Sequence, residues 1–160
     1  MNRRKTCCLQ FYEVGLETTL EQREQIPPLF GLQFTQGAWR QGFIRKESNI
    51  FLLVTLEKTG MPDTFQYEDG FLSPTEFQWQ SQTQTTQGGP AGLAIRNHEA
   101  EGTKVHLFVR SKKLLGGKAA PFYYCGQLRF VSWEGDSPIS VKWSLIHEVP
   151  DFLRSPLGVE

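Results

Sequence analysis

Hydrophobic and polar residues alternate with period two along several stretches of the chain, a pattern typical of half-buried strands. Residues 103–110 place Val105, Leu107 and Val109 on one face, and residues 139–146 alternate in the same way. Because side chains on a strand point alternately to its two faces, each run can bury one face and expose the other. Both runs therefore predict strands that line a core.

Other runs predict strands of different kinds. Residues 50–56 read I-F-L-L-V-T-L, and so continuous an apolar run predicts a central strand that is covered on both faces. Residues 122–133 form a long strand pattern in which Gly126 marks a bulge or a bend. Shorter strands are predicted at residues 37–46 and 93–97.

The N-terminal part has a weaker pattern. Residues 9–14 resemble a strand, and the polar residues 17–25 predict a short helix that Pro27 and Pro28 end. About seven strands joined by short turns, with one or two short helices, predict a mainly β fold of the α+β class. We expect a curved sheet that closes into a barrel.

One globular domain is expected, in three parts. The first part, residues 1–36, holds an N-terminal strand and a short helix that pack on the barrel. The second part, residues 37–147, forms the barrel itself. The third part, residues 148–160, is a C-terminal tail that contains two prolines and trails off from the barrel. The length of 160 residues is enough for one sizeable core.

Residues 76–84 carry the least ordinary pattern in the chain, E-F-Q-W-Q-S-Q-T-Q. Alternation puts Phe77, Trp79 and Ser81 on one face of a strand and a row of glutamines on the other. A glutamine side chain offers two donors and an acceptor, so the row can hydrogen-bond base edges, phosphates or neighbouring loops. The alternative interpretation is the solvated polar face of an edge strand.

The composition narrows the class of protein. No run of about 18 apolar residues occurs, so a membrane span is not expected. The basic start M-N-R-R-K is not followed by the apolar region of a signal peptide, and we expect a cytoplasmic protein. Three cysteines without a C-x-x-C spacing argue against a disulfide framework or a structural zinc site.

The charge is balanced overall but unevenly distributed. Seventeen Lys and Arg residues match seventeen Asp and Glu residues. From Arg96 to Arg129, however, seven basic residues stand against two acidic ones. Such a cluster can follow a phosphate backbone. A solvated loop face is the other interpretation, above all for the Ser-Lys-Lys run at residues 111–113.

The sequence contains no familiar catalytic motif: no G-x-S-x-G elbow, no H-E-x-x-H, no P-loop and no G-x-G-x-x-G. His98, His106 and His147 fall in different elements, and His106 is interpreted as a packed or surface residue. The carboxylates nearest to one another are Asp63, Glu68, Asp69 and Glu76. Their spacing matches no metal-site template. We therefore expect a binding domain without enzyme activity, cofactor or metal.

Residues 73–82, S-P-T-E-F-Q-W-Q-S-Q, resemble the motif S-P-x-x-F-H-W-Q-S-Q of a bacterial domain family of unknown function, with Gln78 in place of the usual His. The similarity extends in order over residues 37–146. Its further segments are residues 50–58, 65–69, 96–98, 105–110 and 126–135, with Pro138 and Trp143. The family is found C-terminal to phospholipase-D-type nuclease and DEAD/DEAH-box helicase modules, including those of restriction enzymes that attack modified DNA.

The resemblance implies a domain that reads a modified base in double-stranded DNA, 5-methylcytosine or a relative, by flipping it into a pocket. Its barrel would be of the broad kind that base-flipping readers use, and nuclease or helicase partners would cleave and translocate the DNA. Aromatic rings would stack on the base and polar side chains would bind its edge. The expected pocket residues are Tyr67, Asp69, Phe77, Trp79, Gln80, Ser81 and Gln82.

A second group of residues is expected to contact the DNA backbone and to make affinity depend on salt. These residues are Arg96, Asn97, His98, Lys104, Arg110, Lys112, Lys113 and Arg129. Plain core packing is the other interpretation of Phe77 and Trp79. Two alternative functions stay open: a protein-docking module for a helicase or nuclease, which predicts an exposed apolar patch, and a small nucleotide hydrolase, which predicts a metal at Asp63, Glu68 and Asp69.

Overall fold

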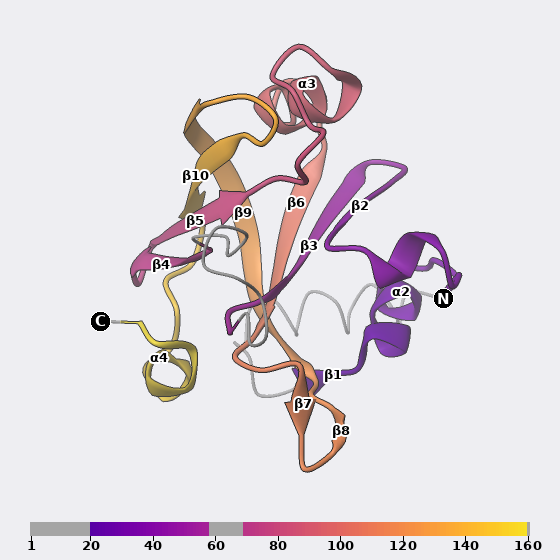
Figure 1. Cartoon of the computed structure of the whole chain (residues 1–160), viewed down its shortest axis with the longest axis vertical. Coiled ribbons are helices and arrows are strands. Elements are labelled where there is room, and N and C mark those ends of the chain that lie inside the picture. Colours follow the sequence, from indigo (N-terminus) through magenta and orange to yellow (C-terminus); the bar gives the residue numbers. More distant parts are fainter. Residues whose placement is uncertain (1–19, 58–68, 160) are drawn as a thin grey trace.

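The structure is a computed structural model that describes residues 20–57 and 69–159 (Figure 1). One mixed sheet dominates it, with seven strands in the order β2-β3-β6-β9-β10-β5-β4 and β1 paired to β9 beside this path. β3 and β6 run parallel, and the other neighbours run antiparallel. The strands are β1 (Leu20–Glu21), β2 (Phe43–Lys46), β3 (Asn49–Thr55), β4 (Gly70–Ser73), β5 (Glu76–Gln80), β6 (Lys104–Arg110), β9 (Phe122–Glu134) and β10 (Ser140–Leu145).

The described residues also form short helices and a small hairpin. Three α-helices are present, where one or two were expected: α2 (Ile26–Leu29), α3 (Pro90–Arg96) and α4 (Asp151–Leu157). The 3-10 turns are η1 (Arg23–Gln25) and η2 (Ala38–Arg40). β7 (Leu114–Leu115) and β8 (Lys118–Ala119) form a two-stranded hairpin that projects from the end of the molecule opposite α3 (Figure 1).

The central strands β3 and β6 are buried on both faces, as the apolar run in residues 50–56 predicts. Ile50, Leu52 and Val54 point into a core that also contains side chains of β5, β10, α3 and α4. Phe51 and Leu53 point to the opposite face, into a second core under α2 and η2. Two layers of side chains therefore cover the two faces of these strands.

The long strand β9 is bent by two irregularities. At the first, Cys125 and Gly126 together face Leu107 of β6, which is the bulge that Gly126 predicts, and Gly126 has φ +90°. At the second, the pairing with β10 shifts between Phe130 and Ser132. Because bulges increase local twist, β9 can pair with β6 along its first half and with β10 along its second half.

The predicted barrel is wrong, although the sheet is strongly curved. Phe43 of β2 and Trp79 of β5 are separated by four strands in the sheet, yet their rings stack with centroids 5.8 Å apart. A barrel closes only when its first and last strands exchange backbone hydrogen bonds. Within the described residues no ladder joins β2 to β4 or β5. Side chains bridge this open seam between β2 and β5, and the sheet remains open.

Residues 93–96 form the end of helix α3 and Asn97 caps it, so the strand predicted at residues 93–97 is wrong. Pro90 occupies the first turn of α3, where its missing N–H is not needed. Gly92 allows the helix to approach the preceding loop, because a Cβ there would lie 2.2 Å from the carbonyl oxygen of Thr86. A short apolar run such as Leu93 to Ile95 cannot by itself distinguish a strand from a buried helix.

Two predictions about the ends of the chain are also corrected. Pro27 and Pro28 lie in the first turn of α2, which begins at Ile26, instead of ending a helix. The expected C-terminal tail does not trail off: it contains α4, whose Leu153 and Leu157 are buried in the first core together with Val159. The strand predicted at residues 9–14 lies outside the described residues.

Cys125 is buried, and burial raises the pKa of its thiol above the ordinary range. The other two cysteines lie outside the described residues. Among the helices of the described part, none is long and apolar enough to cross a membrane.

Candidate functional site

An open cleft of about 420 Å³ lies at the seam between β2 and β5. Its volume falls within the range of about 300–1,000 Å³ that is typical of small-molecule sites. The start of β2, the end of β3 and the loop that follows β5 all contribute to it. The lining residues are Gly42, Phe43, Leu53, Val54, Asp69, Trp79, Gln80, Ser81, Gln82, Thr83 and Gln84.

The two aromatic residues in the cleft form one of its walls. Trp79 is only 5% exposed, and its ring stacks with that of Phe43 at an interplanar angle of 30°. Gly42 lets β2 approach β3 closely, because a Cβ there would lie 3.3 Å from the carbonyl oxygen of Leu53. The Leu53 amide in turn donates to the carbonyl oxygen of Gly42 at 3.0 Å. Packing and backbone contacts thus hold this wall in place.

Asp69 and Ser81 hold the backbone around the cleft. The carboxylate of Asp69 accepts a 2.7 Å hydrogen bond from the amide of Gln80, just beyond the ladder between β4 and β5. Ser81 is buried and exchanges hydrogen bonds with Ile139: its amide donates to the Ile139 carbonyl, and its Oγ accepts from the Ile139 amide, both at 2.9 Å. The Ser81 hydroxyl also donates to the carbonyl oxygen of Gln82 at 3.0 Å. These contacts give both side chains a structural role.

Glutamine side chains form the mouth of the cleft. Gln80 is partly buried, whereas Gln82 and Gln84 are exposed. The side-chain amide of Gln82 donates to Oε1 of Gln41 at 3.3 Å, which joins the two sides of the seam. Each of these side chains can present both a donor and an acceptor to a ligand. The cleft therefore combines an apolar wall with adaptable polar groups.

Five of the seven residues predicted for the base pocket line this one cleft: Asp69, Trp79, Gln80, Ser81 and Gln82. Phe77 does not. It is fully buried in the first core, where its ring meets Phe71 edge to face at 4.8 Å. Tyr67 lies outside the described residues. The predicted alternation of the strand is confirmed, since Phe77, Trp79 and Ser81 are buried and the intervening glutamines are not.

Three cleft residues that the sequence did not reveal come from β2 and β3. Phe43, Leu53 and Val54 lie at strand positions that look like ordinary core residues. The only local signal was Gly42, since a glycine within a strand pattern often marks a close backbone approach. Nothing in the local pattern shows that β2 meets β5, because the contact depends on the curvature of the whole sheet.

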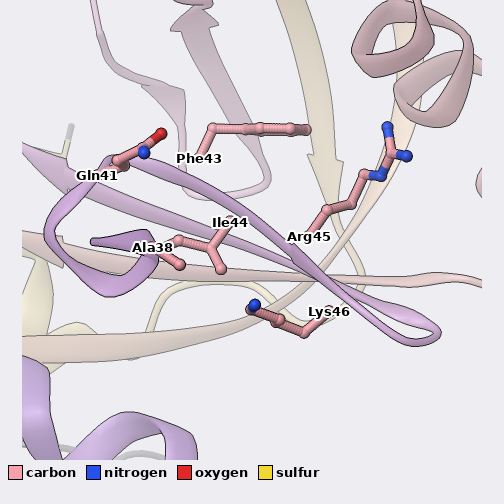
Figure 2. A pocket seen from close by; sticks show the side chains of 6 residues that line it. All are labelled: Ala38, Gln41, Phe43, Ile44, Arg45 and Lys46. Carbon is pink, nitrogen blue, oxygen red and sulfur yellow. The ribbon is translucent and has the colours of Figure 1, made fainter. Parts of the chain in front are cut away.

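The edge strand β2 also borders a smaller pocket of about 240 Å³ (Figure 2). Figure 2 shows Phe43 and Arg45 pointing to one side of β2, while Ile44 and Lys46 point to the other. Arg45 reaches α3, where its guanidinium donates to the carbonyl oxygen of Pro90 at 3.1 Å. Phe43 thus lies in the cleft wall, and Ile44 belongs to the second core.

The structure does not bring the predicted backbone-contact residues together. Lys104 begins β6 and Arg110 ends it, a separation of about 20 Å at 3.3 Å per residue. One group gathers near the start of β6: Arg96, Asn97, His98, Lys104 and Arg129. The other group follows its end: Arg110, Lys112 and Lys113.

In the first group, several residues have structural partners. The ring of His98 is buried and accepts a hydrogen bond from the amide of Phe130 at Nε2, so the proton on Nδ1 faces the carbonyl oxygen of Thr103. Asn97 caps the end of α3 through its backbone. Arg129 forms an exposed ion pair of 2.9 Å with Glu99.

The other two members of the first group are exposed. The guanidinium of Arg96 lies 6.0 Å from the ring centre of Trp133, in a cation–π arrangement. Lys104 begins β6 with an exposed side chain. Both can still reach a ligand.

Arg110 is the most buried cation of the second group, with 7% exposure. It donates to Oγ1 of Thr55 and to the carbonyl oxygen of Ala120, both at 2.9 Å. Burial and then the nearby charge of Arg23 lower the pKa of Arg110 to about 10, so it keeps its charge at neutral pH. Lys112 and Lys113 are exposed beside it.

The histidines do not form a common site. His106 is buried, as expected of a packed residue, between the hydroxyl of Tyr124 at 2.9 Å and Oδ1 of Asn49 at 3.0 Å. Burial and then the charge of Lys104 lower the pKa of His106 to about 3, so its ring is neutral.

No metal-holding cluster was found within the part of the chain that the structure describes. Two of the carboxylates considered above, Asp63 and Glu68, lie outside that part.

Comparison with known proteins places this fold in a family. The family described as Domain of unknown function (DUF3427) matches residues 21–155. The chain belongs to this family. The predicted membership of a domain family of unknown function is confirmed, while the nuclease and helicase context stays a prediction. The comparison of this chain with curated proteins found no match. The match spans β1 through most of α4, so the cleft lies within the family's region.

Proposed function

We propose that this domain recognises a base, flipped out of double-stranded DNA, in the cleft at the open seam. The observation that supports this proposal is the gathering of an aromatic wall and a row of glutamines around one opening. A nucleobase needs both, because it has two apolar faces and a polar edge. The base would be a modified one, 5-methylcytosine or a relative.

Stacking in the cleft would be divided between two rings. Flipping a base costs a few kcal/mol of lost stacking and pairing, and stacking on an aromatic ring returns about 1–3 kcal/mol per base. Trp79 is almost fully covered and its ring faces Phe43, so Trp79 supports the wall. Phe43 is only partly buried and provides the more accessible ring. Tyr67 remains a predicted stacking residue.

The glutamines would read the polar edge of the base. A side-chain amide can accept a hydrogen bond from the amino group of cytosine and donate to its ring acceptors. The modification itself contributes little by comparison, since burial of one methyl group is worth about 0.8 kcal/mol. We therefore assign the choice of base to the exposed amides and the choice of modification to the fit against the wall.

In this proposal the domain does not cut DNA. Cleavage and translocation would be carried out by nuclease and helicase partners, and the domain would direct them to modified DNA in the cytoplasm.

A second candidate function, docking of such a partner, is favoured by the β7–β8 hairpin. Leu114 and Leu115 on this hairpin are 55% and 69% exposed. Larger contiguous apolar patches mark protein contacts, and this pair would form part of one.

The test is fluorescence anisotropy with duplexes that differ in one base: cytosine, 5-methylcytosine, 5-hydroxymethylcytosine, or N6-methyladenine in place of adenine. Binding would be measured at two salt concentrations for the natural chain, for Gln82→Leu and for the control Gln33→Leu. Gln82 is exposed at the cleft, and Gln33 is exposed outside it.

Tighter binding to one modified duplex at both salt concentrations, reduced by Gln82→Leu and not by Gln33→Leu, is the expected result. Equal binding to all duplexes would reject base reading and leave a DNA-contacting surface. No binding to any duplex would reject both and favour the docking function.

A further inference from the structure

A second cavity, of about 600 Å³, lies beside the β7–β8 hairpin and is strongly basic. Five of its lining side chains are cationic and one is acidic. The lining residues are Gln22, Arg23, Glu24, Arg40, Arg110, Lys113, Leu114, Lys118 and Ala119. They come from η1, η2, the end of β6 and the hairpin, so segments far apart in the sequence meet here. We call it the basic cavity.

Two of the guanidinium groups in the basic cavity are held in place. Arg110 lies 4.3 Å and Arg23 lies 5.3 Å from the ring centre of Phe122. Arg23 also donates to the carbonyl oxygens of Trp39 and Gln41, at 3.0 Å each. Such fixed donors lose less conformational freedom on binding than free surface side chains do.

The positive charges in the basic cavity repel one another. Burial and then the charge of Arg40 lower the pKa of Arg23, just as burial and the charge of Arg23 lower that of Arg110. Within the described residues, the only ion pair among the lining residues joins Arg40 to Glu24 at 3.2 Å. This pair is about half exposed, so water screens it. An anion bound among these side chains would relieve the repulsion.

We propose that the basic cavity binds a phosphate group, and that this phosphate belongs to the backbone of the DNA whose base enters the cleft. Guanidinium groups favour phosphate oxygens because their planar donors match them in pairs. The assignment to DNA rests on the proposed function. It is supported by the position of the two openings along the chain. Arg40 lines the basic cavity, and Gly42 and Phe43, two and three residues later, line the cleft.

The main alternative source of the same chemistry is a free polyphosphate, such as the phosphate chain of a nucleotide. Such a ligand would use the same cations but would bind without DNA. Tripolyphosphate and duplex DNA are therefore the two probes that separate these sources.

The variants are Lys113→Gln, Lys118→Gln and their combination. Both lysines are exposed, so these changes leave the packed guanidinium groups in place. The control is Lys142→Gln, which removes one exposed charge from β10 outside the basic cavity. For DNA, the readout is the slope of log affinity against log salt, from anisotropy with modified and unmodified duplexes. For tripolyphosphate, it is calorimetry on the whole chain.

Each single variant is expected to reduce the steepness of the salt slope by about 0.9, and the double variant by about 1.8, for all duplexes alike. Lys142→Gln should leave the slope unchanged. An equal reduction by Lys142→Gln, or no reduction in the double variant, would overturn the proposal even if the chain still prefers a modified duplex.

Tripolyphosphate that binds the natural chain and not the double variant would support the phosphate site. If the chain bound tripolyphosphate in this way but no duplex, the DNA assignment and the proposed function would both fail, while a site for a free polyphosphate would remain. If neither probe bound, the basic cavity would not be a phosphate site.

Discussion

The cleft and the basic cavity are close along the chain but are built in different ways. The wall of the cleft consists of packed rings and backbone hydrogen bonds, and its exposed residues, Gly42, Gln82, Thr83 and Gln84, carry no charge. The basic cavity is lined mainly by charged side chains, two of which lie over the ring of Phe122, and only Arg110 among them is buried. A packed wall favours selection by shape, whereas a set of cations gives attraction that depends on salt and not on base identity.

If the domain binds DNA as proposed, this difference would divide specificity and affinity between the two regions. Substitutions in the cleft should change which duplex is preferred, and substitutions in the basic cavity should change how tightly every duplex is bound. The following changes test how the cleft and its surroundings are held together, mainly through the free energy of unfolding.

Trp79→Ala should have the largest effect, because it removes the ring that supports the cleft wall. Truncation of a buried Trp costs about 3–5 kcal/mol of the free energy of unfolding, and Trp79 is 5% exposed. Urea unfolding would measure the loss. Leu72→Ala on β4 is the control, since Leu72 is 50% exposed and should change stability by less than about 0.5 kcal/mol. Equal losses in the two variants would show that Trp79 is not part of the packed wall.

Ser81→Ala should have the next largest effect. It leaves the buried amide of Ile139 without its acceptor, which costs about 1–3 kcal/mol. Chemical denaturation measures this change, with Ser132→Ala on the exposed part of β9 as the control. A variant as stable as the natural chain would mean that the bond to Ile139 does not hold the end of β5.

A fall in pH should lower the stability of the segment that carries Arg23 and Arg40. This segment packs against His106, since the rings of Phe30 and His106 lie 4.6 Å apart. The folded-state pKa of His106, about 3, is below the unfolded value of 6.5, so the unfolded chain binds the proton more readily. The resulting stability is complete above pH 6.5 and falls as the pH is lowered towards 3.

A change from pH 7 to pH 5.5 should therefore lower the free energy of unfolding by about 1 kcal/mol through protonation of His106 in the unfolded chain. Thermal or urea unfolding at the two pH values measures the loss. The His106→Gln variant should lose this part of the pH dependence. An unchanged dependence in that variant would assign it to other groups.

Arg129→Gln should have the smallest effect, because Arg129 lines neither cavity. Its ion pair with Glu99 is exposed, and such pairs contribute about 0–1 kcal/mol to stability. We expect unfolding and the salt slope to stay within error of the natural chain. A slope change as large as that of Lys113→Gln would place DNA on both ends of β6 and remove the distinction between the two cavities.

The sequence predicted those features that depend on local pattern. Alternation placed Trp79 and Ser81 on the buried face and the glutamines on the other, and the unbroken apolar run identified β3 as a central strand. The bulge at Gly126 was also local, since it depends on one glycine within a long strand. These predictions succeeded because side-chain periodicity is a property of the strand itself.

Features that depend on long-range geometry were not predictable in this way. The stacking of Phe43 on Trp79 needs four intervening strands to curve, and no local pattern encodes that curvature. The basic cavity could not be predicted for the same reason. Arg23 and Arg40 lie outside the basic segment of the sequence, yet they line one cavity with Arg110 and Lys118. The strand prediction for residues 93–97 failed for another reason, since their short apolar pattern fits a helix and a strand equally well.

The open seam also affects how easily this domain can acquire a new specificity. In a closed barrel the width of the interior is set by strand number and stagger, so a change of width disturbs many backbone hydrogen bonds. Here the distance between β2 and β5 is spanned by side chains, among them Phe43, Gln41 and Gln82. Exchange of these side chains can reshape the opening while every strand ladder remains intact. The same scaffold could therefore be adapted, by evolution or by design, to ligands of different size.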